Sequence, residues 1–127
     1  MAVFGPLPSE NKAAYDAVKA AIEMQDAIEA LMKVRGKQDK VTFEIGIGIN
    51  TGSSIVGNVG AETRMDYTVI GDSVNVAARL QQMAGGGEII IGELTYSTSK
   101  DHFSLQKRGE VRVKNKIEPV MCYEVLR

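Results

Sequence analysis

The residues best suited to chemistry lie on one predicted helix. Asn75 and Arg79 are four residues apart, so a helix from about residue 72 to residue 83 places both side chains on the same face. This helix follows Gly71, and the amide groups at a helix N-terminus attract anions. A guanidinium and an amide on one polar edge, beside such a terminus, suit the binding of a phosphate or a ribose. The alternative interpretation is a solvated helix face.

Glycines are concentrated before this helix, which raises the question of a phosphate-binding loop. The run from Gly52 to Gly57 has the spacing of a Walker A loop, but Asn58 and Val59 follow where that loop requires Lys and Ser or Thr. The stretch that begins at Gly46 lacks the third glycine of the dinucleotide-binding fingerprint. Both motifs are therefore excluded, and a tightly packed strand is the favoured explanation of the glycines.

The other reactive side chains indicate no second site. His102, the single histidine, lies in a polar segment and is interpreted as solvated, whereas Cys122, the single cysteine, lies in an apolar strand and is interpreted as a core residue. Together they provide neither a zinc framework nor an intrachain disulfide. Asp66 and Asp72 form a candidate carboxylate pair, but Asp72 is better explained as the cap of the helix that follows it.

Hydrophobic periodicity predicts the elements that position these residues. Apolar residues at steps of three and four predict a long helix from about residue 9 to Gly36. Strict alternation predicts a strand over 41–49, and 55–60 and 65–70 are interpreted as a hairpin-like excursion and a short strand. Val74, Ala77, Ala78 and Leu80 are the expected packing residues of the helix over 72–83. Further strands are expected at 1–4, 88–91, 103–113 and 119–126, and a short helix at 92–100.

Strands outnumber helices in this order, and no βαβ unit repeats. The fold class is therefore α+β, with a largely antiparallel sheet that carries helices on one face. A chain of 127 residues has the size of a single domain.

Charge and composition exclude several classes of protein. Fifteen Lys and Arg against sixteen Asp and Glu give a formal net charge of -1, so no global field attracts nucleic acid or an anionic membrane. The longest apolar runs fall far short of the roughly 20 residues that a bilayer-spanning helix needs. A single cysteine fits a reducing compartment. We therefore expect a cytoplasmic location, with no nucleic-acid partner and no direct membrane contact.

A longer segment around Asn75 and Arg79 carries a family resemblance. Residues 66–80, DYTVIGDSVNVAARL, resemble the signature segment of the class III nucleotidyl cyclases, the adenylate and guanylate cyclase family. Residues 45–52 and 57–60 resemble the strand and loop before that segment, and 113–120 resemble the lysine-bearing strand pair that closes the domain. The matching segments follow one another along the chain in the same order as in the family. The resemblance implies a ferredoxin-like class III cyclase fold.

The resemblance also implies roles for four residues, at a nucleotide site shared by two domains that pair head to tail. Asn75 would orient the ribose and the attacking 3′-hydroxyl, and Arg79 would stabilise the charge that develops on the α-phosphate. Lys114 would hold the β- and γ-phosphates. Thr68 falls at the position that reads the base, where it favours adenine over guanine. These roles imply an adenylate cyclase that makes cyclic AMP and pyrophosphate from ATP.

The resemblance covers the latter two-thirds of the family's domain, so residues 1–127 are expected to be a single partial cyclase domain that lacks its first strands. Family members carry two metal-binding aspartates upstream of the segment that matches Met1. Metal ligands are therefore expected outside this chain, with Mg²⁺ or Mn²⁺ in the complete enzyme and none bound here. We expect the chain to be inactive alone and to act in cyclic-nucleotide signalling as a homodimer or paired with another cyclase domain. A non-catalytic cyclase-like regulatory module and a guanylate cyclase are the alternatives.

Overall fold

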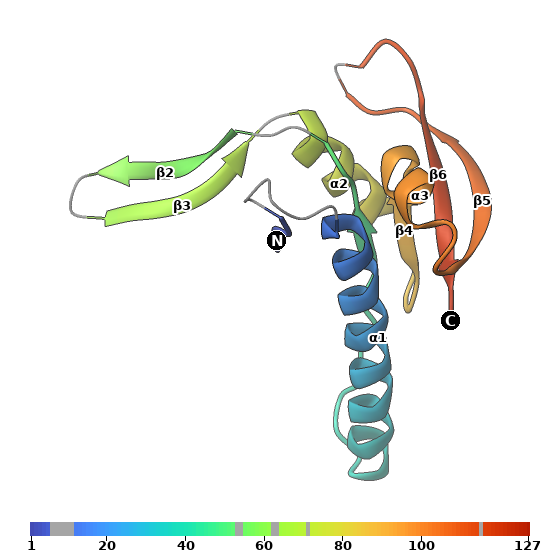
Figure 1. The fold of residues 1–127 in the computed structure, drawn as a ribbon. Coiled ribbons are helices and arrows are strands. Elements are labelled where there is room, and N and C mark those ends of the chain that lie inside the picture. Colours follow the sequence, from blue (N-terminus) through green and yellow to red (C-terminus); the bar gives the residue numbers. More distant parts are fainter. Residues whose placement is uncertain (6–11, 53–54, 62–63, 71, 115) are drawn as a thin grey trace.

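The computed structural model describes residues 1–5, 12–52, 55–61, 64–70, 72–114 and 116–127, with the backbone alone over 55–61 and 64–70. Within these residues a four-stranded sheet, a separate two-stranded hairpin and three helices form an α+β fold (Figure 1), which confirms the expected class. In chain order the elements are α1 (Ala13–Lys37), β1 (Ile47–Ile49), β2 (Ile55–Ala61), β3 (Arg64–Ile70), α2 (Asp72–Met83), β4 (Ile89–Gly92), α3 (Glu93–Ser99), β5 (Ser104–Val111) and β6 (Val120–Leu126).

The strands of the larger sheet lie in the order β1-β4-β6-β5. β1 pairs with β4 in parallel, with Ile47 opposite Ile89, and β6 is antiparallel to both β4 and β5. The sheet is therefore largely antiparallel, as expected, with a parallel pair at one end. β1 lies at that end, so within the described residues one of its two edges has no neighbouring strand.

Helices cover both faces of this sheet, and the prediction of one covered face is wrong. Ile90 packs in a cluster with Leu80 of α2, whereas Ile89 and Ile91 pack in a second cluster with Val18 of α1. Successive side chains of a strand point to opposite faces. A continuous apolar run is typical of a strand buried on both faces, and β4 has this character because α1 and α2 enclose it.

The long helix is confirmed, but its C-terminal end differs from the prediction. α1 begins at Ala13 after Lys12 as its N-cap residue, and the predicted start at residue 9 lies outside the described residues. Gly36 stays inside the helix. The left-handed backbone conformation that often follows a helix is adopted instead by Asp39, with φ of 56°. Aspartate tolerates this conformation better than most residues with a side chain.

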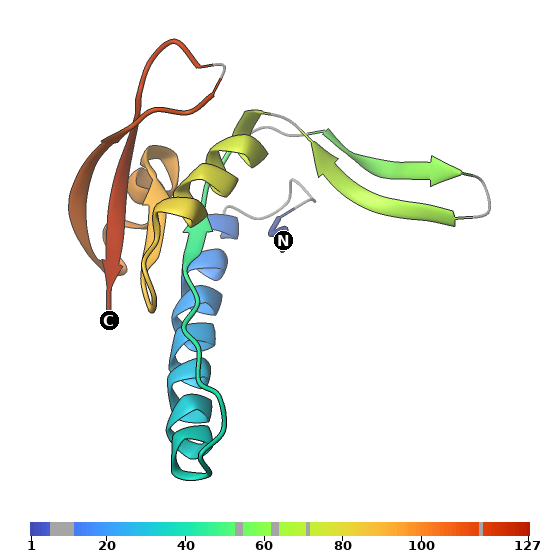
Figure 2. The same ribbon diagram turned by 180° about the vertical axis from the view of Figure 1, so that it is seen from behind.

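The alternating segment 41–49 forms a shorter strand than its pattern predicts. Only Ile47–Ile49 pairs within a sheet, and the preceding residues run beside the C-terminal half of α1 (Figure 2). There Arg35 Nε donates to the carbonyl oxygen of Val41 at 2.8 Å, and the amide of Phe43 lies 3.1 Å from Met32 Sδ. The alternation gives these residues two distinct faces, but a sheet also requires a neighbouring strand.

The predicted strand at residues 1–4 is wrong. These residues are exposed and belong to no strand, because nothing in the described part of the chain pairs with them. The other predicted elements are confirmed: the hairpin of β2 and β3, helices α2 and α3, and strands β4, β5 and β6. No helix among the described residues combines the length and the apolar character needed to cross a bilayer.

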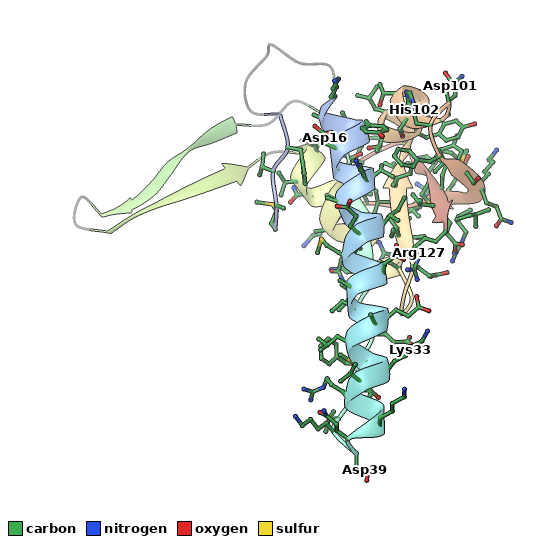
Figure 3. The ribbon with its side chains drawn as sticks, turned by 60° about the horizontal axis from the view of Figure 1, so that its bottom comes forward. Asp16, Lys33, Asp39, Asp101, His102 and Arg127 are labelled. Atoms are coloured by element: carbon green, nitrogen blue, oxygen red, sulfur yellow. The ribbon has the colours of Figure 1, made fainter. Side chains whose placement is uncertain are left out.

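Contacts at two levels fix α1 against the C-terminal half of the chain. Near its start, Tyr15 makes an edge-on contact with His102, with ring centroids 5.2 Å apart. Near its middle, Arg127 Nη1 lies 2.6 Å from Asp26 Oδ1, and Figure 3 shows both His102 and Arg127 beside the helix. His102 is exposed, as predicted. Buried Gln25 adds a third tie by donating to the carbonyl oxygen of Glu88 at 3.1 Å.

Candidate functional site

α2 lies directly on β1, and glycines make this close approach possible. A Cβ atom at Gly48 would collide with the backbone nitrogen of Gln81 and would lie 2.6 Å from the carbonyl oxygen of Ala77. A Cβ atom at Gly46 would lie 2.6 Å from the carbonyl oxygen of Ala84. The tightly packed strand expected from the glycine pattern is therefore confirmed, with the helix backbone as the packing partner.

The burial of α2 sets which of its residues face solvent. Val76 and Leu80 are buried in the core, whereas the expected packing residue Ala78 is exposed. Positions 76 and 80 are one helical turn apart and face the sheet, so positions 75 and 79 lie on the neighbouring strip of the helix. Asn75 and Arg79 are both exposed, one turn apart on the same face, as predicted.

Arg79 is held by two hydrogen bonds. Its Nε donates to the carbonyl oxygen of Arg112 at 3.2 Å, and its Nη1 lies 3.5 Å from Gln82 Oε1. The first of these bonds joins α2 to the segment that follows β5. The guanidinium is thus positioned by its inner nitrogen, while the side chain remains exposed to solvent.

Lys114 is exposed in the segment between β5 and β6, and that segment packs against α2. Val113 is buried in the cluster that contains Val76. Lys116 Nζ lies 3.5 Å from Asp72 Oδ2 at the start of α2. The structure therefore brings the loop of Lys114 onto the helix that carries Asn75 and Arg79. The sequence alone does not reveal this ion pair, because Asp72 has the pattern of a helix cap and the two charges are far apart in the chain.

Thr68 lies on a different element from the other three predicted site residues. It is part of β3, opposite Gly57 of β2, and the hairpin of these strands projects away from the four-stranded sheet (Figure 1). β3 ends at Ile70, shortly before Asp72 opens α2. The backbone thus places Thr68 near the N-terminal end of the site helix along the chain. Its side chain lies outside the described atoms, so its role as a base reader stays a prediction.

Comparison with known proteins decides the family. The family model for the adenylate and guanylate cyclase catalytic domain matches residues 1–126. The chain belongs to this family. It is 40% identical over 131 residues to the terminal-differentiation specific adenylate cyclase of Dictyostelium discoideum, covering 99% of this chain and 6% of that protein.

Solved cyclase structures share the fold. The adenylyl cyclase CyaB from P. aeruginosa superposes with a TM-score of 0.90 at 41% identity, covering 98% of this chain and 65% of that one. The guanylate cyclase domain of RhGC from Catenaria anguillulae, solved in complex with GTP, superposes with a TM-score of 0.84 at 26% identity, covering 97% of this chain and 64% of that one. The chain thus spans less than two-thirds of the length of these relatives.

A groove of about 670 Å³ adjoins the site helix of this cyclase domain. It lies between the start of α2, α3 and the segment before β6, and both Asp72 and Lys116 line it. Glu93 and Glu118 give the groove further carboxylates, and Ser97 gives it a hydroxyl. At this groove, the ion pair of Asp72 and Lys116 therefore joins the start of α2 to the loop between β5 and β6.

The described residues of the cyclase domain contain no cluster of metal-binding side chains. Among them, no three His, Cys, Asp or Glu side chains lie close enough together to share one. Asp72 is paired with Lys116, and Asp66 lies on β3, where only the backbone is described. Cys122 is buried, and burial raises the pKa of its thiol, which makes it a poor nucleophile and confirms it as a core residue.

Proposed function

We propose that this chain forms part of a class III adenylate cyclase catalytic domain, which converts ATP to cyclic AMP and pyrophosphate in cyclic-nucleotide signalling. One observation carries the proposal: Asn75 and Arg79 are exposed one turn apart on α2, and the loop with Lys114 is bound to the same helix. An amide, a guanidinium and an ammonium group together suit the ribose and the phosphates of a nucleoside triphosphate.

The chemistry assigns each of these groups a separate task. The ribose 3′-oxygen attacks the α-phosphorus, the bond from that phosphorus to the oxygen bridging to the β-phosphate breaks, pyrophosphate leaves and the hydroxyl proton passes to solvent. Asn75 orients the ribose for this attack, Arg79 stabilises the charge on the α-phosphate, and Lys114 binds the departing β- and γ-phosphates. Cations already in place before the reaction stabilise such charge without the cost of reorganising.

ATP is the proposed substrate. Thr68 at the base-reading position supports adenine through the resemblance, and adenylate cyclases are among the relatives at about 40% identity. GTP is the competing substrate, because a related domain was solved with it. Comparing the rates of cyclic AMP and cyclic GTP formation separates the two.

The proposed assembly is a homodimer or a pair with another cyclase domain, with the nucleotide between the two domains. The resemblance leads us to assign the Mg²⁺ or Mn²⁺ of the complete enzyme to residues outside this chain, and we therefore expect the chain alone to be inactive. A cytoplasmic location is part of the same proposal, since the reaction consumes ATP.

Complementation tests the proposal directly. The full chain is titrated into a complete cyclase domain that keeps its metal-binding aspartates but has lost its own counterparts of Asn75 and Arg79. Cyclic AMP formation from ATP should appear as the chain is added. Arg79→Ala should lower the restored rate by roughly 10²-fold or more, because the α-phosphate charge loses its donor.

Arg112→Ala is the matched control, because Arg79 bonds to the backbone carbonyl oxygen of Arg112 and not to its side chain. The control should restore activity like the wild type. If the chain associated with the defective domain but wild type and Arg79→Ala restored equal rates, the catalytic role of Arg79 would be wrong and the non-catalytic module would be favoured.

A further inference from the structure

The loop that carries Lys114 is tied to α2 on both sides of that lysine. Before it, the carbonyl oxygen of Arg112 accepts a hydrogen bond from Arg79 Nε at 3.2 Å. After it, Lys116 Nζ lies 3.5 Å from Asp72 Oδ2. The two ties reach α2 at opposite ends of a stretch two turns long, so they restrain both the position and the tilt of the loop.

Buried and backbone contacts complete the restraint between these ties. Val113 is 6% exposed and packs in the cluster with Val76 and Leu80 of α2. The amide of Lys116 donates to the carbonyl oxygen of Val113 at 3.1 Å, which closes the chain around Lys114. Lys114 is exposed, whereas Val113 and Lys116 are held against the helix.

The ion pair of Asp72 and Lys116 differs from the other ties because it depends on two side chains at the surface. Asp72 opens α2, where the helix dipole favours a carboxylate. Its side chain is 67% exposed, and that of Lys116 is 34% exposed. Exposed pairs of this kind contribute little to the free energy of unfolding. Loss of the pair should therefore free one side of the loop and leave the fold intact.

We propose that Asp72 and Lys116 are positioning residues of the nucleotide site. Their ion pair holds the loop on α2 so that Lys114 meets the β- and γ-phosphates of a nucleotide whose ribose and α-phosphate are bound by Asn75 and Arg79. This inference rests on the function proposed above. Neither Asp72 nor Lys116 needs to touch the nucleotide.

The test measures KM and kcat for ATP in the complemented assembly, with the chain in saturating amount. Lys116→Met and Asp72→Asn should each raise KM about two- to fivefold, the size expected for an exposed ion pair, and should change kcat less. The double variant should be no worse than either single one, because both changes break the same pair. Lys116→Arg should retain the wild-type KM, and Lys100→Met, at an exposed lysine after α3, is the matched control. Urea unfolding midpoints should stay near the wild-type value.

Repeating Lys116→Met in a Lys114→Ala background shows whether the effect passes through Lys114. Lys114→Ala should itself raise KM, and Lys116→Met should then add nothing. An unchanged KM for Lys116→Met, or an equal increase in both backgrounds, would overturn the positioning role and leave the proposed function standing. A wild-type KM for Lys114→Ala would overturn its phosphate role in the proposed function, and the positioning role with it.

Discussion

One face of β1 and one edge of β1 differ sharply in how this chain covers them. On the face towards α2 the packing is so close that Gly48 has no room for a Cβ atom. Along the edge that does not pair with β4, no strand lies beside β1 in the described residues, and in the segment leading into β1 Val41 is 78% exposed and Phe43 49%. The helix that carries the candidate site is thus positioned by contacts within the chain, whereas no strand covers this edge of β1 within the described residues.

The outer face of α1 also carries exposed apolar residues. Apolar residues recur along it at steps of three and four, and the largest of them are exposed, with Met24 at 52% and Leu31 at 48%. Exposed apolar residues that recur along one face of a helix favour association with another surface.

Among the variants that test this comparison, one that fills the space between α2 and β1 should have the largest effect on stability. Gly48→Ala places a Cβ atom against the backbone of Ala77 and Gln81, so helix and strand must separate. We expect a loss of about 1–3 kcal/mol in the free energy of unfolding, measured by urea titration.

Gly36→Ala is the control for the same chemical change. Gly36 is exposed inside α1, with nothing within 4 Å of an added Cβ atom. Alanine should therefore stabilise the chain by up to about 1 kcal/mol through its helix propensity. Similar small changes for both variants would show that α2 does not rest on β1 as closely as described.

The same contrast explains how much of the fold could be predicted from the sequence. Local periodicity correctly predicted α2 and the exposed pair of Asn75 and Arg79, because the helical period alone decides which residues share a face. It failed at 41–46, where alternation was clear but pairing depends on a neighbour elsewhere in the chain. Partners that are remote in the sequence are invisible to periodicity.

The candidate site could likewise be predicted only in part from the sequence. The residue types and the family motif indicated Asn75, Arg79 and Lys114, but not the contacts that hold the loop of Lys114 in place. The pair of Asp72 and Lys116 joins elements separated by β4, α3 and β5. Only the folded chain brings the two charges together.

Placing a charge at an exposed apolar residue of α1 or of the segment before β1 should weaken self-association and leave the free energy of unfolding unchanged. We expect the wild-type chain to associate with itself as its concentration rises, and Leu31→Lys or Val41→Lys to reduce this association. Both positions are exposed, so unfolding free energies should stay within about 0.5 kcal/mol of wild type. Sedimentation velocity over a concentration series measures the effect. Gln38→Lys adds the same charge at an exposed position beyond α1 and should associate like the wild type; a monomeric wild type at every concentration would contradict the prediction.

The smallest expected effect on stability concerns an ion-pair network that joins strands of the sheet, away from α2 and from the unpaired edge of β1. Arg108 Nη1 lies 2.8 Å from Glu88 Oε2 and also contacts Glu124, so one guanidinium links the start of β4 to β5 and β6. The Arg108 guanidinium and the Gly85 N–H lower the pKa of Glu88 from 4.5 to about 2. A carboxylate whose pKa is lowered by folding stabilises the fold above its unfolded pKa, and this contribution is lost as the pH falls through the folded value.

The stability gap between wild type and Glu88→Gln should therefore be largest at neutral pH and should close between about pH 4.5 and pH 2. Because Arg108 and Glu88 are partly exposed, solvent screening limits the gap to about 0.5–1 kcal/mol. Urea midpoints across this pH range measure it, with Glu110→Gln on β5 as the matched control. A gap that stayed constant down to pH 2 would mean that Glu88 acts through packing, and the link between β4 and β5 would then owe nothing to its charge.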